Sequence, residues 1–223
     1  MSETNKVQIT LTPPKVQAVE FGIDGLTDLL CCALPAFIDN KEEKRKRRAK
    51  SAKGNQPTPE DDAEPTGSPE EQFKRSLYHL PDGTLAFPSS AIQAACATYL
   101  CRFNPINPRY AKDTPPVFYG ATFMLDELMP IICSNPPRMQ HDIARNSRGK
   151  RIDIYRGAFK DWKMRVAMEF NPDIITLERL INALNGAGRS VGVGAHRPEC
   201  RGRFGRFVVT SAALLEVKER EAA

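Results

Sequence analysis

The stretch GRSVGVGAHRPECRGRFGRF, residues 188–207, constrains the fold more than any other part of the chain. It contains five Gly and five Arg residues, and Glu199 is its one acidic residue. Glycine lacks a Cβ, so a segment this rich in Gly adopts positive φ angles and lets other groups approach its backbone closely. The run RFVVTSAALLEV begins at its end and has the composition of one or two β-strands. The fold must therefore place a cationic, glycine-rich loop directly before a strand.

Positive charge is concentrated in the same region. The 223 residues carry a formal net charge of +5. From Arg138 to Arg206 there are 15 Lys and Arg residues against 7 Asp and Glu residues, a net charge of +8, so the rest of the chain is slightly acidic. Such concentration is typical of proteins that bind a polyanion such as nucleic acid. A basic surface that is merely solvated is the alternative that charge alone leaves open.

Composition argues against several classes of protein. No run of 18 apolar residues is present, so we expect no membrane span and no membrane partner. The first ten residues, MSETNKVQIT, lack the apolar core of a signal peptide. The six Cys residues include no C-x-x-C pair, which indicates reduced thiols. We therefore expect a cytoplasmic protein.

We expect residues 1–223 to form a single domain with one insertion. Residues 39–67 contain no large aliphatic or aromatic residue, and they are basic in the first half and acidic in the second. Such a segment cannot bury enough apolar surface to offset the entropy lost on ordering, so we predict a flexible charged loop. Its KRKRRAK run either contacts phosphates, acts as a localisation signal or is simply solvated. Residues 135–151, which are polar and basic, are expected to form a hairpin arm or a mobile loop.

Hydrophobic periodicity and turn residues predict alternating strands and helices. Ser68, Pro69 and Glu71 form a capping box that begins a helix ending near Leu80. Two further helices are predicted at 89–103 and 173–184. The other predicted elements are strands at 6–11, 15–23, 117–125, 129–134, 151–159 and 163–170, and a Pro-rich loop at 104–116. This order predicts an α+β fold with a ferredoxin-like or RNA-recognition-motif-like βαββαβ core that carries insertions.

The residue chemistry points to phosphate binding. A loop dense in Gly exposes N–H donors to phosphate oxygens, and its Arg side chains add charge-assisted, bidentate contacts. Ser89 and Ser90 begin a predicted helix, and the N-terminus of a helix attracts anions. We expect this helix start and the late loop to lie close together, with a sugar-phosphate chain between them. The alternative for the same glycines is that they form tight turns at strand ends.

Aromatic and basic residues elsewhere extend this expectation. Trp162 lies between Lys160 and Lys163, and Phe204 lies inside the Arg-rich stretch, so both rings are candidates for stacking on bases. The predicted arm at 135–151 would reach the nucleic acid or a neighbouring subunit. Its candidate contacts are Arg145, Arg148, Lys150 and Arg151.

Three segments, taken in order, resemble one superfamily. They are VEFGIDGLTDLL at 19–30, DGTLAFPSSAIQAA at 82–95 and LNGAGRSVGVGAHRPECRGRFGRF at 184–207. They resemble, respectively, the first strand and its turn, the hairpin that leads into the first helix, and the late glycine-rich loop of the repeat-associated mysterious proteins (RAMPs) of class 1 CRISPR effectors. The resemblance covers residues 16–30 and 76–210. Two features depart from the family: Gln93 stands where Lys or Arg is common, and AHRPEC interrupts the loop, which we interpret as the mark of a divergent, for example phage-borne, branch.

The resemblance implies a protein that coats a guide RNA, or another single-stranded RNA, within an RNA-guided complex. Within the family the nearest branch is that of the backbone subunits, which implies head-to-tail assembly with further copies of the chain and contact with a target strand. Together with the residue chemistry, it gives a set of expected RNA contacts. They are Ser89, Ser90, Gln93, Arg145, Arg148, Lys150, Arg151, Lys160, Trp162, Lys163, Gly188, Arg189, Gly192, Gly194, His196, Arg197, Arg201, Arg203, Phe204 and Arg206.

Two other classes of function stay open. An RNA-processing endonuclease of the same superfamily would use His196 or His79 as acid or base, and a non-catalytic adaptor would bind an acidic protein partner. We expect no enzymatic activity, because the His residues lack metal-ligand spacing and no nucleotide-binding motif is present. No metal or cofactor is expected.

Overall fold

The structure is a computed structural model, and it describes residues 15–33, 68–145 and 151–216. The predicted strand at 6–11 and the predicted insertion at 39–67 lie outside the described residues. Arg148 and Lys150 lie outside them too, and Arg145 is described by its backbone alone.

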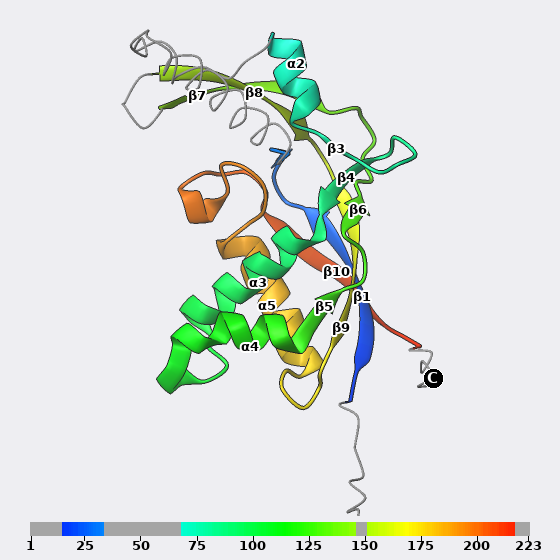
Figure 1. Ribbon diagram of the computed structural model, residues 1–223, viewed down its shortest axis with the longest axis vertical. Helices are drawn as coiled ribbons and strands as arrows, with labels where there is room; N and C mark the ends of the chain where they lie inside the picture. The colour runs from blue at the N-terminus through cyan, green and yellow to red at the C-terminus, as the bar shows by residue number, and fades with distance from the viewer. Residues whose placement is uncertain (1–14, 34–67, 146–150, 217–223) are drawn as a thin grey trace, which may run out of the picture.

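A four-stranded antiparallel sheet forms the core, and helices cover one of its faces (Figure 1). Across the sheet the strands are β10 (Phe207–Leu215), β1 (Gln17–Gly25), β9 (Lys163–Phe170) and β5 (Thr122–Met124). Helix α3 (Ser89–Phe103) comes between β1 and β5 in the chain, and α5 (Leu177–Ser190) comes between β9 and β10. These six elements form a βαββαβ unit whose last strand lies beside its first. The predicted ferredoxin-like core is therefore confirmed.

The face of the sheet beneath the helices carries the apolar core. In β1, the alternate residues Val19, Phe21 and Ile23 are fully buried, as the period of two in a strand requires. Leu180 and Leu184 of α5 lie one helical turn apart and are also fully buried. Each such side chain contributes about 1.5–3 kcal/mol to stability through removal from water. The core therefore fixes the helices, and with them the loops that follow, on one side of the sheet.

Two smaller antiparallel sheets extend this core toward the top of Figure 1. One contains β2 (Leu29–Leu30), β8 (Arg151–Phe159) and β7 (Arg138–Arg145), and the other contains β3 (Tyr78–His79), β4 (Leu85–Pro88) and β6 (Leu128–Pro130). Strands β7 and β8 pair along their whole length, from Arg138 opposite Ala158 to Arg145 opposite Arg151. The segment expected to be an arm or a mobile loop thus supplies one strand of a long hairpin, and α2 (Pro69–Arg75) packs against β8.

The predicted strand at 117–125 is correct only for Thr122–Met124, which form β5, because residues 117–121 are helical. Thr114–Ala121 forms helix α4, which follows a short 3-10 helix, η1, at Pro108–Asp113. The two prolines of α4 lie in its first turn, where a missing N–H costs no hydrogen bond. Phe118 and Ala121 are buried at a helical spacing of three. We interpreted these prolines as the end of a loop, whereas they begin a helix.

Helix α2 begins with the predicted capping box but ends earlier than predicted. The Ser68 hydroxyl accepts from the Glu71 amide, and the Glu71 carboxylate accepts from the Ser68 amide. The helix ends at Arg75 because Ser76 turns the chain: its hydroxyl donates to the Phe73 carbonyl at 2.7 Å and accepts from the Gly157 amide at 2.8 Å. This end is therefore fixed by a residue of β8 that lies far away in the sequence.

Helix α5 lies further along the chain than predicted. It begins at Leu177, after an N-cap at Thr176, and continues to Ser190, so Gly188 and Arg189 belong to its last turn. Gly188 is buried, and a Cβ built on it would lie 2.3 Å from the carbonyl oxygen of Phe207. Glycine at this position permits close approach of α5 to β10. Its predicted role in a loop that approaches phosphate is wrong.

We predict opposite effects for the same substitution at two helical glycines. Gly188→Ala should lower the free energy of unfolding by about 1–3 kcal/mol, because α5 and β10 must separate to admit the methyl group. Gly120→Ala in α4 is the control: a Cβ there meets nothing within 4 Å, so the higher helix propensity of Ala should stabilise by about 0.5–1 kcal/mol. Urea unfolding measures both, and a neutral or stabilising Gly188→Ala would contradict the packing.

Candidate nucleic-acid interface

The chain between α5 and β10, residues 191–206, is named here the Gly/Arg loop. It is orange in Figure 1 and lies between α5 and the β7–β8 hairpin. The loop is docked on the turn after β1, because the Ala195 amide donates to the Leu30 carbonyl and the Gly205 amide donates to the Asp28 carbonyl. Within the loop, the Val193 amide donates to the Gly205 carbonyl. Its backbone is therefore a fixed part of the fold.

The glycines of this loop serve its docking. Gly192, Gly194 and Gly205 have φ angles of 70°, 76° and 69°, which favour glycine. A Cβ on Gly194 would lie 2.4 Å from the Leu30 carbonyl oxygen, and the Gly192 amide already donates to the Ala187 carbonyl. The turn-forming alternative is thus the better account of these glycines. The expectation that Gly192 offers its N–H group to phosphate is wrong.

The arginines of the loop region differ in whether they are exposed to solvent or bonded within the protein. Arg189, Arg201 and Arg203 are exposed. The Arg197 guanidinium instead pairs with Glu199, and Arg206 Nε donates to the Arg189 carbonyl at 3.2 Å. Three cations of the region therefore reach solvent in a position to meet a ligand.

Phe204 is the aromatic residue of this loop. Its ring is partly buried, and the Arg203 guanidinium lies 5.2 Å from the ring centroid. This cation–π contact orders both side chains.

Glu199 joins the loop to the end of α3. It lies in the 3-10 turn η2 (Pro198–Cys200), and its carboxylate accepts from Arg197 at 2.7 Å and from Arg102 at 2.9 Å. Arg102 lies in the last turn of α3, about 20 Å along the helix from Ser89 at its start. The loop is therefore fastened to the opposite end of α3 from the one we expected.

The start of α3 is occupied by contacts within the protein. Ser89 is buried, and its amide and hydroxyl both donate to carbonyl groups of the turn at 126–127. Gln93 Nε2 donates to the carbonyl and the hydroxyl of Thr122, each at 3.0 Å. The predicted phosphate contact of the buried Ser89 is therefore wrong, and the Gln93 amide nitrogen is engaged within the protein. Ser90 is the exposed residue of the three.

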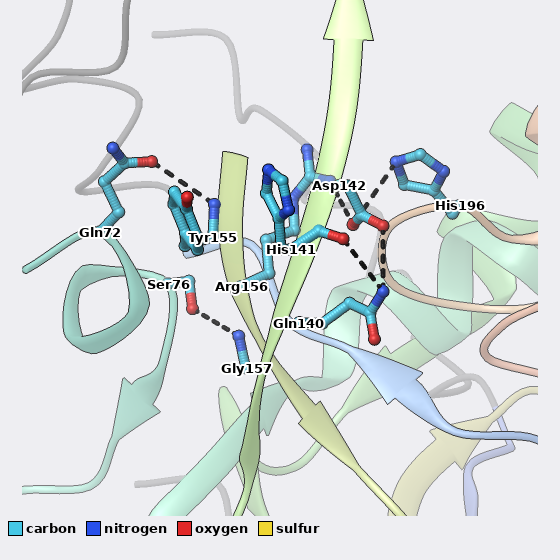
Figure 2. A network of polar contacts seen from close by, with 9 residues as sticks. All are labelled: Gln72, Ser76, Gln140, His141, Asp142, Tyr155, Arg156, Gly157 and His196. Atoms are coloured by element: carbon cyan, nitrogen blue, oxygen red, sulfur yellow. Dashed lines mark hydrogen bonds and ion pairs between the residues drawn. The ribbon is translucent and has the colours of Figure 1, made fainter. Parts of the chain in front are cut away.

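A carboxylate of the hairpin fixes the other side of the loop (Figure 2). His196 Nε2 lies 3.9 Å from Asp142 Oδ2, and Arg156 Nη1 lies 3.3 Å from the same oxygen. Gln140 Nε2 donates to Asp142 Oδ1 at 3.3 Å. The side chains of Asp142 and Arg156 are each 13% exposed. Asp142 thus links β7, β8 and the Gly/Arg loop at one nearly buried position.

The opposite face of the hairpin is held by α2 (Figure 2). Gln72 Oε1 accepts from the Tyr155 amide at 3.4 Å. His141 stacks on Tyr155 at 4.8 Å between ring centroids, and its Nε2 lies 2.6 Å from Asp153 Oδ1. The hairpin is therefore clamped at its base between α2 and the Gly/Arg loop. Sequence patterns gave no signal for the contacts that join the hairpin to α2 and to the Gly/Arg loop, since these segments lie far apart in the chain.

Trp162 is not a base-stacking residue. Its side chain is fully buried, and its Nε1 donates to the Thr27 carbonyl at 2.8 Å. Lys163 Nζ is 2.7 Å from Asp24 on the uncovered face of the core sheet. Lys160 and Arg151 are exposed, on segments outside the Gly/Arg loop.

The uncovered face of the core sheet is poorly suited to RNA. RNA-recognition motifs stack bases on aromatic residues of their central strands. Here the central strands β1 and β9 present opposite charges to each other: Arg165 pairs with Glu20 at 3.8 Å, and Lys163 with Asp24. The exposed aromatic residue of this face, Phe123, lies on the edge strand β5. Arg201 and Arg203 of the Gly/Arg loop are, by contrast, exposed.

Two cysteines and His79, among the described residues, lie in structural surroundings. Burial raises the pKa of the Cys31 thiol, and it raises that of Cys96 to about 12, so both stay protonated at neutral pH. His79 Nδ1 lies 3.2 Å from the Gly83 carbonyl oxygen, in the turn between β3 and β4. Within the ranges that the structure describes, no three His, Cys, Asp or Glu residues gather as a metal site, and no helix there has the length and apolar character to cross a membrane.

Comparison with known proteins gives a result at the level of the fold. No family model and no curated protein matches the sequence. A chain of the type III-B Cmr-beta complex, in a cryo-EM structure with cognate target RNA, superposes with a TM-score of 0.54 at 9% identity, over 91% of this chain and 61% of that one. This chain shares the fold of that subunit. It spans about three fifths of that neighbour's length. Cmr6 from Pyrococcus furiosus aligns over 87% of this chain and 99% of its own at 16% identity, with a TM-score of 0.43.

We predict that Asp142→Asn loosens the joint between the hairpin and the loop. Removing the carboxylate charge leaves the nearly buried Arg156 without its ionic partner, which should cost about 1–3 kcal/mol in the free energy of unfolding. Hydrogen exchange of amides in the Gly/Arg loop should also become faster. The control is Asp153→Asn, which removes an exposed partner of His141 and should change stability by less than about 0.5 kcal/mol. Equal effects of both variants would contradict the assigned joint.

Proposed function

We propose that this protein binds single-stranded RNA along the Gly/Arg loop, as a subunit of an RNA-guided complex. The observation that carries this proposal is the exposure of Arg201 and Arg203 on the Gly/Arg loop, whose backbone is hydrogen-bonded to residues 28–30. Arg189, also exposed, lies just before the loop in the last turn of α5. A fixed backbone has already lost its conformational entropy, so binding a phosphate chain does not require further ordering of the loop. The RAMP-type fold, shared with a neighbour whose complex was solved with target RNA, supports the same function.

The arginine chemistry suits a phosphate backbone more than a base sequence. Guanidinium groups form bidentate, charge-assisted contacts with phosphate oxygens. The loop contains no second carboxylate besides Glu199, which two arginines already neutralise. We therefore expect affinity with little dependence on sequence, as a coating protein needs.

The finer form of the proposal is that copies of the chain coat a guide RNA side by side, head to tail, and so present the guide to a target strand. The long β7–β8 hairpin, clamped at its base, supports this form, since it projects from the core sheet (Figure 1). Its described basic residues include Arg151, which is exposed.

We predict that the loop arginines set the salt dependence of RNA binding. Arg201→Ala and Arg203→Ala should each weaken binding of a labelled 20-nucleotide oligouridine by about tenfold. Each should also lower the slope of log K against log salt by about 0.7, the value for one contact on a single strand. Fluorescence anisotropy over a KCl series measures both quantities. The control is Arg165→Ala, whose side chain lies on the uncovered sheet face and should leave affinity and slope unchanged.

Two results would contradict the proposal. One is an absence of RNA binding by the wild-type protein at low salt. The other is equal loss of affinity in Arg201→Ala and Arg165→Ala, which would indicate a response to net charge with no defined site.

A metal-independent ribonuclease is the second candidate, and the position of His196 favours it. Its side chain is 41% exposed at the edge of the loop, with Asp142 at 3.9 Å, so a bound strand would pass within reach of an imidazole beside a carboxylate. We expect incubation with repeat-containing RNA in EDTA to leave the RNA intact, because Asp142, the carboxylate beside His196, is already paired with Arg156. Cleavage by wild type that His196→Ala abolishes, and that Arg165→Ala retains, would establish the ribonuclease instead.

A further inference from the structure

Phe103 is the last residue of α3, and its side chain is 62% exposed. A single exposed apolar ring is ordinary on protein surfaces and by itself indicates no site. Phe103 differs in being held: its ring packs on Tyr99, with centroids 5.4 Å apart and ring planes at 37°. One face of this aromatic pair is therefore presented to solvent in a defined orientation.

The support of Phe103 extends into α5. The Tyr99 ring covers Gly186, where a Cβ would lie 2.1 Å from Tyr99 Cζ. Any larger residue at 186 would push the ring away from α5. Because Tyr99 is seated in this way, Phe103 loses little further freedom when another planar group stacks on it. A ring already ordered is a better stacking surface than a freely rotating one.

Arginines make contacts at the same end of α3 as Phe103. Arg102, the preceding residue, shares the Glu199 carboxylate with Arg197 of the Gly/Arg loop, so two guanidinium groups face one carboxylate. Arg179 of α5 donates from Nη2 to the Pro105 carbonyl at 2.6 Å, two residues beyond Phe103. Phe103 thus directly follows in the chain the residue that joins α3 to the loop.

We propose that Phe103 is a base-stacking platform for single-stranded RNA, placed where the strand leaves the Gly/Arg loop and crosses the end of α3. This inference rests on the proposed function and adds a base contact to its phosphate contacts. Cations attract the phosphate backbone of the RNA, and a neighbouring ring stacks on a base of any identity. Proteins that bind single strands without sequence preference combine these two interactions. A protein partner that docks on the same ring is the competing occupant, and the experiment below distinguishes it.

The test compares three variants in oligouridine binding. Phe103→Ala should weaken binding by about tenfold, the size expected for one base–aromatic stack, with the salt slope unchanged because no phosphate contact is lost. Phe103→Tyr should bind within about twofold of wild type, since the ring is kept. Phe123→Ala is the matched control, because Phe123 is 65% exposed on the uncovered face of the core sheet. It should bind as wild type does.

A second readout reports stacking directly. A 2-aminopurine moved along the oligonucleotide should be quenched on binding at one position, and Phe103→Ala should remove that quenching.

The outcomes separate this inference from the function on which it rests. If wild type binds RNA with a steep salt slope while Phe103→Ala binds equally well, the platform is wrong and the loop site stands. If wild type binds no RNA, both are wrong. If Phe103→Ala leaves RNA affinity unchanged but abolishes self-association in light scattering, the ring is a protein contact.

Discussion

The docking of the Gly/Arg loop on the turn after β1 is the contact on which the rest of this surface depends. Residues 26–30 receive or give hydrogen bonds at successive positions: the Leu26 amide donates to the Arg206 carbonyl, the Arg206 amide to the Thr27 hydroxyl, and the Gly205 amide to the Asp28 carbonyl. Two of the three sequence segments that resemble one superfamily, 19–30 and 184–207, are therefore physical partners. Glycine is needed at 194 because the backbone of Leu30 lies against it, whereas Gly202 and Gly205 are crowded by the backbone of the loop itself.

Two carboxylates determine which cations of the loop region are paired within the protein. Glu199 takes up Arg197 and Arg102, and Asp142 approaches His196 while it pairs with Arg156. Each carboxylate connects the loop to a different element, α3 or the hairpin. The cations without such partners are those on the exposed outer side. The arginine that holds the loop in place is thus different from the arginines that are proposed to bind RNA.

The uncovered face of the core sheet differs from the RNA-binding face of an RNA-recognition motif. On the uncovered face, Lys163 and Arg165 are paired with acidic residues of β1, and the central strands carry no aromatic residue there. Its central strands therefore offer neither unpaired cations at these two positions for phosphates nor rings for bases. In the proposed function, the cations that bind phosphate and the ring that stacks on a base lie instead where the Gly/Arg loop meets the end of α3.

The sequence by itself determined the elements with clear periodicity, such as β1, α3, β8 and β9, and through their order the βαββαβ core. It also identified the Gly/Arg segment as unusual. It failed where local signals were ambiguous, as at the two prolines that begin α4, and it placed Trp162 on the surface although the indole is buried over Thr27. Only the tertiary structure decided that Asp142, Arg156 and Arg102 belong with the loop. Periodicity reports which face of an element is buried, whereas an ion pair between residues 97 positions apart, such as Arg102 and Glu199, leaves no local pattern in the chain.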